Sequence, residues 1–201
     1  MAAVLTILTA QVRYEDLLNR MSMPVLNNWR WLGLSLIVIG LDQLTKLLAS
    51  SALLLYKPVG IFPGVNLTLM FNTGAAFSFL RDAGGWQRWF FTAIAIVISI
   101  MILIWLHRLP RNDKWSLFAL SLILGGAIGN VIDRILYGHV IDFMDMYYKG
   151  KDCLPGFSGY LGECHWPAFN LADSAIFVSV VMLIIDGLFI RRQQQTKQGS
   201  K

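Results

Sequence analysis

One stretch decides how this chain folds and where its chemistry lies: LGGAIGNVIDRILYGHVIDF, from Leu124 to Phe143. A second stretch, FNLADS from Phe169 to Ser174, complements it further along the chain. Both lie at the edge of long apolar runs, where an ionised carboxylate is costly and seldom kept without a function. Two aspartates that meet there can share a proton, so that one acts as acid and the other as base.

The composition indicates a membrane protein. Of 201 residues, 56% are hydrophobic and only 14% are charged, which is too apolar for a soluble domain of this size. The net charge of +5 comes from basic residues just outside the apolar runs, a distribution that favours membrane orientation. No basic block interleaves with aromatic residues in a polar context, so we expect no nucleic-acid partner.

Four apolar segments are long enough to cross a hydrocarbon core, which takes ~20 residues of helix. They cover about 29–51, 89–106, 115–136 and 169–190. The third carries Gly125, Gly126, Ala127 and Gly129, a small-residue face that allows close helix approach. We therefore predict an all-α membrane protein with four transmembrane helices.

Residues 56–79 follow a different pattern. Apolar and polar side chains alternate from Val65 to Asn72, a period of two that predicts a strand. An open sheet edge cannot face lipid, so we expect a small extracytoplasmic β-sheet at the membrane surface. We expect 137–167 to form a polar extracytoplasmic loop, with Asp142 at the outward turn that ends the third span.

The distribution of basic residues predicts orientation. The short basic connector 107–114 and the basic tail from Arg191 directly flank the spans, so that side is predicted to be cytoplasmic, with both termini. Polar positions from separate segments then converge near the outer face: Asp42, Asn72, Asp133, Asp142 and Asp173.

Several local pairs have two interpretations. Asp42 and Lys46 lie one helical turn apart and can form an ion pair, or they can add a polar patch to the same interior. Asp133 and Arg134 are interpreted as a local charge pair that ends the third helix. Cys153 and Cys164 are either a disulfide, if their loop faces an oxidising compartment, or two free thiols.

Other chemistries fit less well. A serine hydrolase would need a nearby base, and no G-x-S-x-G motif is present. The potential metal ligands follow no H-E-x-x-H type of spacing, so we expect no metal: His139, Asp142, Asp145, Cys164 and His165. A transporter would also keep intramembrane carboxylates, but no repeat is evident. A non-catalytic protein that holds lipidated peptides would need the sheet and the pocket but not both aspartates.

Over about 31–190, the chain resembles the lipoprotein signal peptidase (signal peptidase II) family. Five motifs in order carry the resemblance: DQxTK from Asp42, NTGAAFS from Asn72, GGAxGNxxDR from Gly125, VxDF from Val140 and FNxADS from Phe169. The resemblance implies an intramembrane aspartyl endopeptidase of the bacterial inner membrane. Such an enzyme cleaves the signal peptide of a diacylglyceryl-modified prolipoprotein just before the lipidated cysteine, needs no cofactor and is blocked by globomycin.

By motif, the resemblance places the catalytic pair on Asp142 and Asp173. Supporting or substrate-binding positions fall on Asp42, Lys46, Asn72, Gly74, Asn130, Arg134, Asn170 and Ala172. The 56–79 segment corresponds to the family's surface sheet, which cradles the substrate. We expect a monomer surrounded by membrane lipid.

The chain is expected to have three parts. Residues 1–22, whose apolar part is too short to span a membrane and which precede a possible alternative start at Met23, are expected to be an N-terminal extension of unknown role. We expect 23–192 to form the four-helix peptidase domain and 193–201 a cytoplasmic tail. The segment 145–166 is longer than is usual between the family's two catalytic motifs. We therefore hypothesise a flap over the active-site cleft, closed by a Cys153–Cys164 disulfide.

Overall fold

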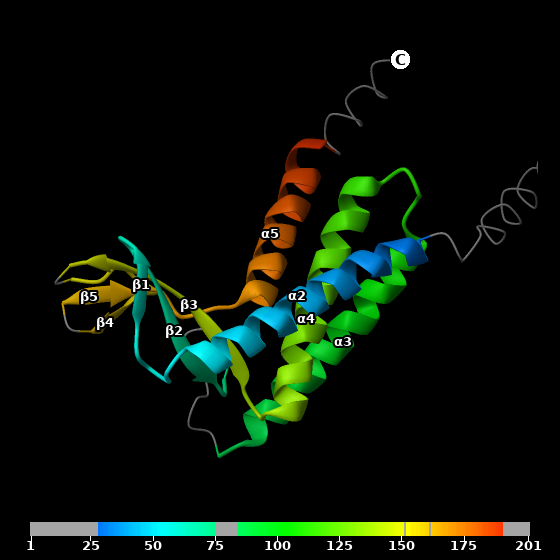
Figure 1. The fold of residues 1–201 in the computed structure, drawn as a ribbon. Helices are drawn as coiled ribbons and strands as arrows, with labels where there is room; N and C mark the ends of the chain where they lie inside the picture. Colours follow the sequence, from blue (N-terminus) through cyan, green and yellow to red (C-terminus); the bar gives the residue numbers. More distant parts are fainter. Residues whose placement is uncertain (1–27, 75–83, 151, 161, 191–201) are drawn as a thin grey trace, which may run out of the picture.

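A computed structural model describes residues 28–74, 84–150, 152–160 and 162–190. Its helical part comprises the short 3-10 helix η1 (Trp29–Trp31), α2 (Leu32–Ala52), α3 (Trp86–Arg108), α4 (Lys114–Leu136) and α5 (Leu171–Ile185), which continues as the π-helical segment η3 (Asp186–Ile190) (Figure 1). Four of these segments are long and apolar enough to cross a membrane: Arg30–Ala52, Trp86–Arg108, Lys114–Leu136 and Leu171–Leu188. The four predicted spans are confirmed, and the predicted segments 1–22 and 193–201 lie outside the described residues.

Helix α4 is the centre of the bundle and packs against α2, α3 and α5. The predicted small-residue face makes this possible. A Cβ atom added to Gly125 would lie 2.7 Å from Val38 Cβ on α2, and one added to Gly126 would lie 2.5 Å from the Ala172 carbonyl oxygen on α5. Since real side chains never approach so closely, both neighbouring helices depend on these glycines.

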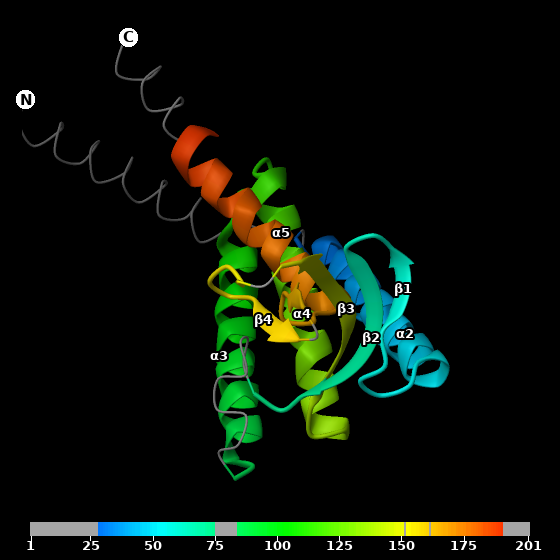
Figure 2. The same ribbon diagram turned by 90° about the vertical axis from the view of Figure 1, so that its left-hand side faces the viewer.

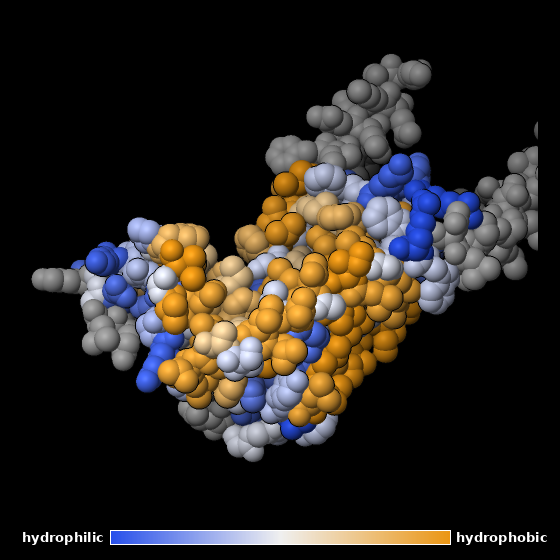
Figure 3. Space-filling view, viewed as in Figure 1, coloured by the Kyte–Doolittle hydropathy of each residue, from blue (hydrophilic) through white to orange (hydrophobic). Residues whose placement is uncertain are grey.

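The outward faces of the helices are hydrophobic. Figure 3 shows a nearly continuous hydrophobic surface over the bundle. Large exposed side chains include Leu36 on α2, Val97 on α3 and Phe177 on α5, which is 70% exposed. A soluble protein rarely keeps an apolar surface of this extent, so lipid is the natural solvent for it.

The β-sheet lies at the end of the bundle where α5 begins (Figures 1 and 2). Its strands are β1 (Val59–Phe62), β2 (Val65–Asn72), β3 (Val140–Lys149), β4 (Ser158–Tyr160) and β5 (Glu163–His165). They pair antiparallel in the order β1-β2-β3-β5-β4. The predicted sheet is confirmed for β1 and β2.

The prediction of a loop over 137–167 is wrong, because this segment supplies the other three strands. Strand β3 buries four consecutive residues, Val140 to Phe143, so both of its faces are packed. A strand covered on both faces lacks the alternation of apolar and polar residues by which strands are recognised. Asp142 consequently lies on a strand and not at a helical turn.

The hairpin of β4 and β5 pairs with β3 through β5, and a disulfide joins β5 to the loop that precedes β4. Cys153 and Cys164 form a disulfide, with their Cα atoms 5.4 Å apart. His165 Nδ1 lies 2.8 Å from Asp145 Oδ1, and Asp145 Oδ2 accepts a hydrogen bond from Thr68 Oγ1 at 2.9 Å. The 137–167 segment therefore extends the sheet and is cross-linked within itself by the disulfide.

Candidate active site

Asp142 is a buried carboxylate on the central strand of the sheet. It is 2% exposed and pairs with Met70 across the β2–β3 ladder. Its Oδ2 atom accepts a hydrogen bond from Asn72 Nδ2 at 3.1 Å, and its Oδ1 atom accepts one from Asn170 Nδ2 at 2.7 Å. Burial, and then the negative charge of Asp173, raise the pKa of Asp142 to about 7.

Asp173 lies in the first turn of α5. Its Oδ1 atom accepts a hydrogen bond from Asn130 Nδ2 on α4 at 2.8 Å. Asn170 and Asp173 form a capping box, in which each side chain accepts a hydrogen bond from the other residue's backbone N–H, at 2.9 Å and 3.3 Å. The helix N-terminus favours a negative charge at this place.

Asn170 connects the two aspartates. A backbone N–H can only donate, so the bond from the Asp173 N–H fixes the Asn170 side-chain oxygen towards α5. The amino group of the same amide then points to Asp142. The prediction that Asp142 and Asp173 come together at one membrane depth is consistent with this geometry, although a strand and a helix bring them there instead of two helices.

A buried ion triad lies beside the pair. Lys46 Nζ is 2.7 Å from Asp42 Oδ2, 2.8 Å from Asp133 Oδ2 and 2.9 Å from Asn130 Oδ1, so all three donors of the ammonium have partners. The predicted Asp42–Lys46 pair is confirmed. The predicted local pair of Asp133 with Arg134 is wrong: the Asp133 carboxylate is held by Lys46, and by Gln43 Nε2 at 2.9 Å.

Ala172 and Gly74 contribute backbone groups. The Ala172 N–H donates to Asp42 Oδ1 at 3.0 Å. Gly74 donates its N–H to Asn72 Oδ1 at 3.1 Å, and its carbonyl oxygen lies 3.4 Å from Arg134 Nη2. The Arg134 guanidinium thus lies between the end of α4 and the end of β2. The rest of the NTGAAFS motif, 75–78, lies outside the described residues.

The potential metal ligands named from the sequence all lie among the described residues, and the structure does not gather them around one point. The described residues contain no group of three or more His, Cys, Asp and Glu side chains arranged to hold a metal ion. His139 packs on Phe71 with ring centroids 4.1 Å apart, and burial lowers its pKa. Cys164 is in a disulfide, and His165 and Asp145 pair with each other, so these three potential ligands already have other partners.

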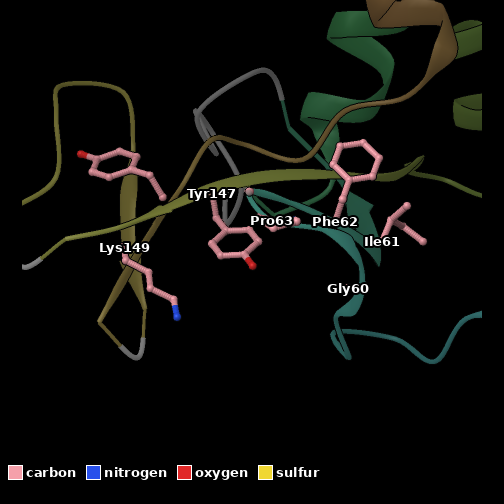
Figure 4. Close-up of a pocket in the computed structure, with 8 residues that line it drawn as sticks. Gly60, Ile61, Phe62, Pro63, Tyr147 and Lys149 are labelled. Atoms are coloured by element: carbon pink, nitrogen blue, oxygen red, sulfur yellow. The ribbon is translucent and has the colours of Figure 1, made fainter.

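A cavity of about 610 Å³ opens at the outer part of the sheet. It is lined by the β1–β2 turn and the end of β3, where Tyr147 and Lys149 point to the same side (Figure 4). Neither aspartate of the pair contributes to its walls. The carboxylate chemistry therefore lies elsewhere, and we do not assign this cavity to the active site.

Comparison with known proteins identifies the family of this chain. Residues 34–189 match the family model described as Signal peptidase (SPase) II. The lipoprotein signal peptidase of Acinetobacter baumannii is 48% identical over 168 residues, covering 84% of this chain and 88% of that protein. The lipoprotein signal peptidase of Pseudomonas putida is 48% identical over 157 residues, covering 78% and 85%.

Solved structures agree as well. Two structures described as a bacterial membrane enzyme are similar to this fold. The first has 30% identity and a TM-score of 0.65, over 79% of this chain and 87% of that chain. The second has 29% identity and a TM-score of 0.63, over 80% and 93%. The resemblance noted in the sequence is confirmed, and the chain belongs to the signal peptidase II family of lipoprotein signal peptidases.

Proposed function

We propose that this membrane protease uses Asp142 and Asp173 as an aspartyl dyad. Its substrate is a diacylglyceryl-modified prolipoprotein, cut on the N-terminal side of the lipidated cysteine. The observation that carries the proposal is the side chain of Asn170, which bonds Asp142 directly and is held in place by the Asp173 backbone. Two buried carboxylates so linked at a membrane edge suit a shared proton.

The reaction needs one proton on the pair. The ionised carboxylate takes a proton from a water molecule, whose oxygen attacks the scissile carbonyl carbon. The protonated carboxyl donates a hydrogen bond to the carbonyl oxygen, which becomes the oxyanion. When the tetrahedral intermediate collapses, the C–N bond breaks and the nitrogen of the leaving amine takes a proton from the dyad. Because burial raises the pKa of Asp142 to about 7, a proton is available near neutral pH.

The other candidate residues have supporting roles in this proposal. Asn72, Asn130 and Asn170 orient the two carboxylates through the bonds described above. Arg134 lies near enough for its positive charge to act on both aspartates, and we propose that it also binds the substrate backbone near Gly74. We propose a monomeric enzyme without cofactor, inhibited by globomycin.

The substrate reaches the dyad from the membrane. Figure 3 shows the surface hollowed between the sheet and α5, with mostly hydrophobic residues around it. On α5, Phe177 and Val178 are exposed. The apolar core of a signal peptide and the lipid chains can pack against this hydrophobic surface, because burying apolar groups against one another is favourable. Membrane lipid fills the same surface when no substrate is bound.

We place the dyad at the outer face of the bacterial inner membrane, with both termini in the cytoplasm. The basic segment from Arg108 to Lys114 flanks the opposite end of the bundle, as cytoplasmic loops do. The disulfide at the sheet end supports an oxidising compartment there. A green fluorescent protein fused after Lys201 tests the orientation: it fluoresces only if the C-terminus is cytoplasmic.

Asp142→Asn and Asp173→Asn test the catalytic assignment. Each is nearly isosteric, so the fold persists while acid–base function is lost. We expect cleavage of a lipidated prolipoprotein in detergent to fall at least about 10³-fold in both variants. Asp145→Asn is the matched control, since Asp145 is an equally buried carboxylate on the same strand with different partners. It keeps near-wild-type cleavage.

Two outcomes would contradict the proposal. If both variants still cleave at the wild-type rate, the dyad is assigned wrongly. If the wild type binds the lipidated substrate without cleaving it, the protein holds lipidated peptides instead of cutting them.

A further inference from the structure

Asp42 and Asp133, the two acids of the buried triad, each bind the backbone next to one of the two catalytic candidates. Asp42 Oδ1 accepts the backbone N–H of Ala172, the residue before Asp173, at 3.0 Å. Asp133 Oδ2 accepts the backbone N–H of Ile141, the residue before Asp142, at 3.1 Å. Each acid therefore holds the main chain one residue ahead of one aspartate.

Lys46 joins these two contacts into one unit. Its ammonium lies 2.7 Å from Asp42 Oδ2 and 2.8 Å from Asp133 Oδ2, so it fixes the distance between them. Helix α4 leaves room for this arrangement, since a Cβ atom on Gly129 would lie 2.5 Å from Asp42 Oδ2. A second link between the backbones that carry the two aspartates, besides the one through Asn170, thus runs through this ammonium.

The cost of this triad indicates a function beyond stability. Asp42 and Asp133 are fully buried and Lys46 is 1% exposed. Removing charges from water costs several kcal/mol per ion, and well-packed apolar residues often replace such groups without loss of stability. Apolar residues in these places would not hold the backbones of β3 and α5 at a fixed distance from each other.

We propose that Asp42, Lys46 and Asp133 form a clamp that sets the separation of Asp142 and Asp173. The inference rests on the proposed function and adds Asp133, which carries no role there, as a positioning residue. The clamp acts through the backbone of β3 and of α5, where a displacement of about 1 Å is enough to slow a reaction about 100-fold.

Asp133 offers a test that separates position from charge. Its Oδ2 atom alone contacts both Lys46 and the Ile141 N–H. Asp133→Asn keeps an oxygen at that place and loses the charge, while Asp133→Glu keeps the charge and displaces the oxygen. The clamp predicts that Asp133→Asn retains kcat within about 10-fold and that Asp133→Glu loses about 10- to 100-fold, with KM within about 3-fold of wild type in both.

The pH profile gives a second readout that general destabilisation would not move. The charge of Asp173 contributes to the raised pKa of Asp142. If Asp133→Glu pushes β3 away from that charge, the pKa of Asp142 falls, and the alkaline limb of kcat/KM moves to lower pH. In Asp133→Asn the alkaline limb of kcat/KM stays at the pH of the wild type. Asp186→Asn and Asp186→Glu, the same changes at a buried acid in the last segment of the bundle, leave kcat and the limb unchanged.

Three results would overturn the clamp. In the first, Asp133→Glu keeps wild-type kcat and pH profile. In the second, Asp133→Asn loses more activity than Asp133→Glu, which would assign the effect to charge. In the third, both variants lose kcat in proportion to their thermal stability, with the limb unmoved. The proposed function fails separately, through an Asp142→Asn variant that still cleaves, so the two failures are distinguishable.

Discussion

Asn170 donates a hydrogen bond of 2.7 Å from its side-chain amide to Asp142 Oδ1, while its side-chain oxygen caps the helix that carries Asp173. One side chain thus serves the N-terminus of α5 and the carboxylate on β3. The cap and the donor can be separated by mutation, because they use different atoms.

Asn170→Ser keeps a capping oxygen but is too short to reach Asp142. We expect the cap itself to change the free energy of unfolding by no more than about 0.5 kcal/mol, since serine and asparagine cap helices about equally well. The lost amide donor to the buried Asp142 carboxylate lowers stability by a further ~1–3 kcal/mol. We expect kcat to fall about 10- to 100-fold, because Asp142 loses an oriented donor. Thermal unfolding measures the change in stability and single-turnover cleavage measures the change in kcat. A variant whose cleavage falls only because less of the protein is folded would contradict a separate role for the amide donor.

Activity should decline above neutral pH. The pKa of Asp142 is raised to about 7 by burial and by Asp173. Above that pH the Asp142 carboxyl loses its proton, which the reaction needs to polarise the scissile carbonyl, so kcat/KM falls by about tenfold per pH unit. A profile that stays flat from pH 6 to pH 9 would exclude the shared proton.

The same shift predicts a pH-dependent stability. An aspartate in an unfolded chain titrates near ~4, and Asp142 in the folded protein titrates at about 7. Between these values the folded state binds the proton more tightly, so this contribution to stability is full below ~4 and is lost as the pH rises through about 7. Asp142→Asn removes the dependence.

Thermal unfolding of that variant at two pH values measures the effect. We expect it to be more stable than wild type at pH 8, by on the order of a few kcal/mol, and about equal near pH 4. A variant that is less stable than wild type at both pH values would contradict the raised pKa.

Gly126→Ala tests the contact between α4 and α5. The added Cβ atom would lie 2.5 Å from the Ala172 carbonyl oxygen, a backbone atom that cannot rotate away. We expect α5 to shift, with a loss of about 1–3 kcal/mol of stability and a fall in cleavage, because Asp173 moves with the helix. Gly40→Ala on α2 is the control, since nothing lies within 4 Å of its new Cβ atom.

The disulfide should stabilise the sheet extension locally. It closes a loop with a sequence separation of 11, for which chain entropy predicts about 3 kcal/mol or less. We expect Cys153→Ser/Cys164→Ser to raise hydrogen exchange in β4 and β5, while Asp142→Asn leaves exchange there unchanged. Faster exchange throughout the bundle would show instead that the disulfide supports the whole fold.

Local patterns in the sequence predict the membrane class, the four spans, the small-residue face of α4 and the strand over Val65–Asn72. Each of these follows from a local pattern: the length of an apolar run, the spacing of glycines, or a period of two. The motifs also carried the family resemblance and the choice of Asp142 and Asp173 as catalytic candidates.

The partner of Asp133 depends on contacts between helices that the sequence does not reveal. Asp133 is next to Arg134 in sequence but pairs with Lys46 on another helix, because α2 and α4 pack closely over glycines. The sequence also did not reveal the strand that carries Asp142. Both faces of β3 are packed, so apolar and polar residues do not alternate along it. Contacts between segments distant in sequence leave no periodic signal in the chain, so the geometry that links the dyad to its buried triad is a property of the fold alone.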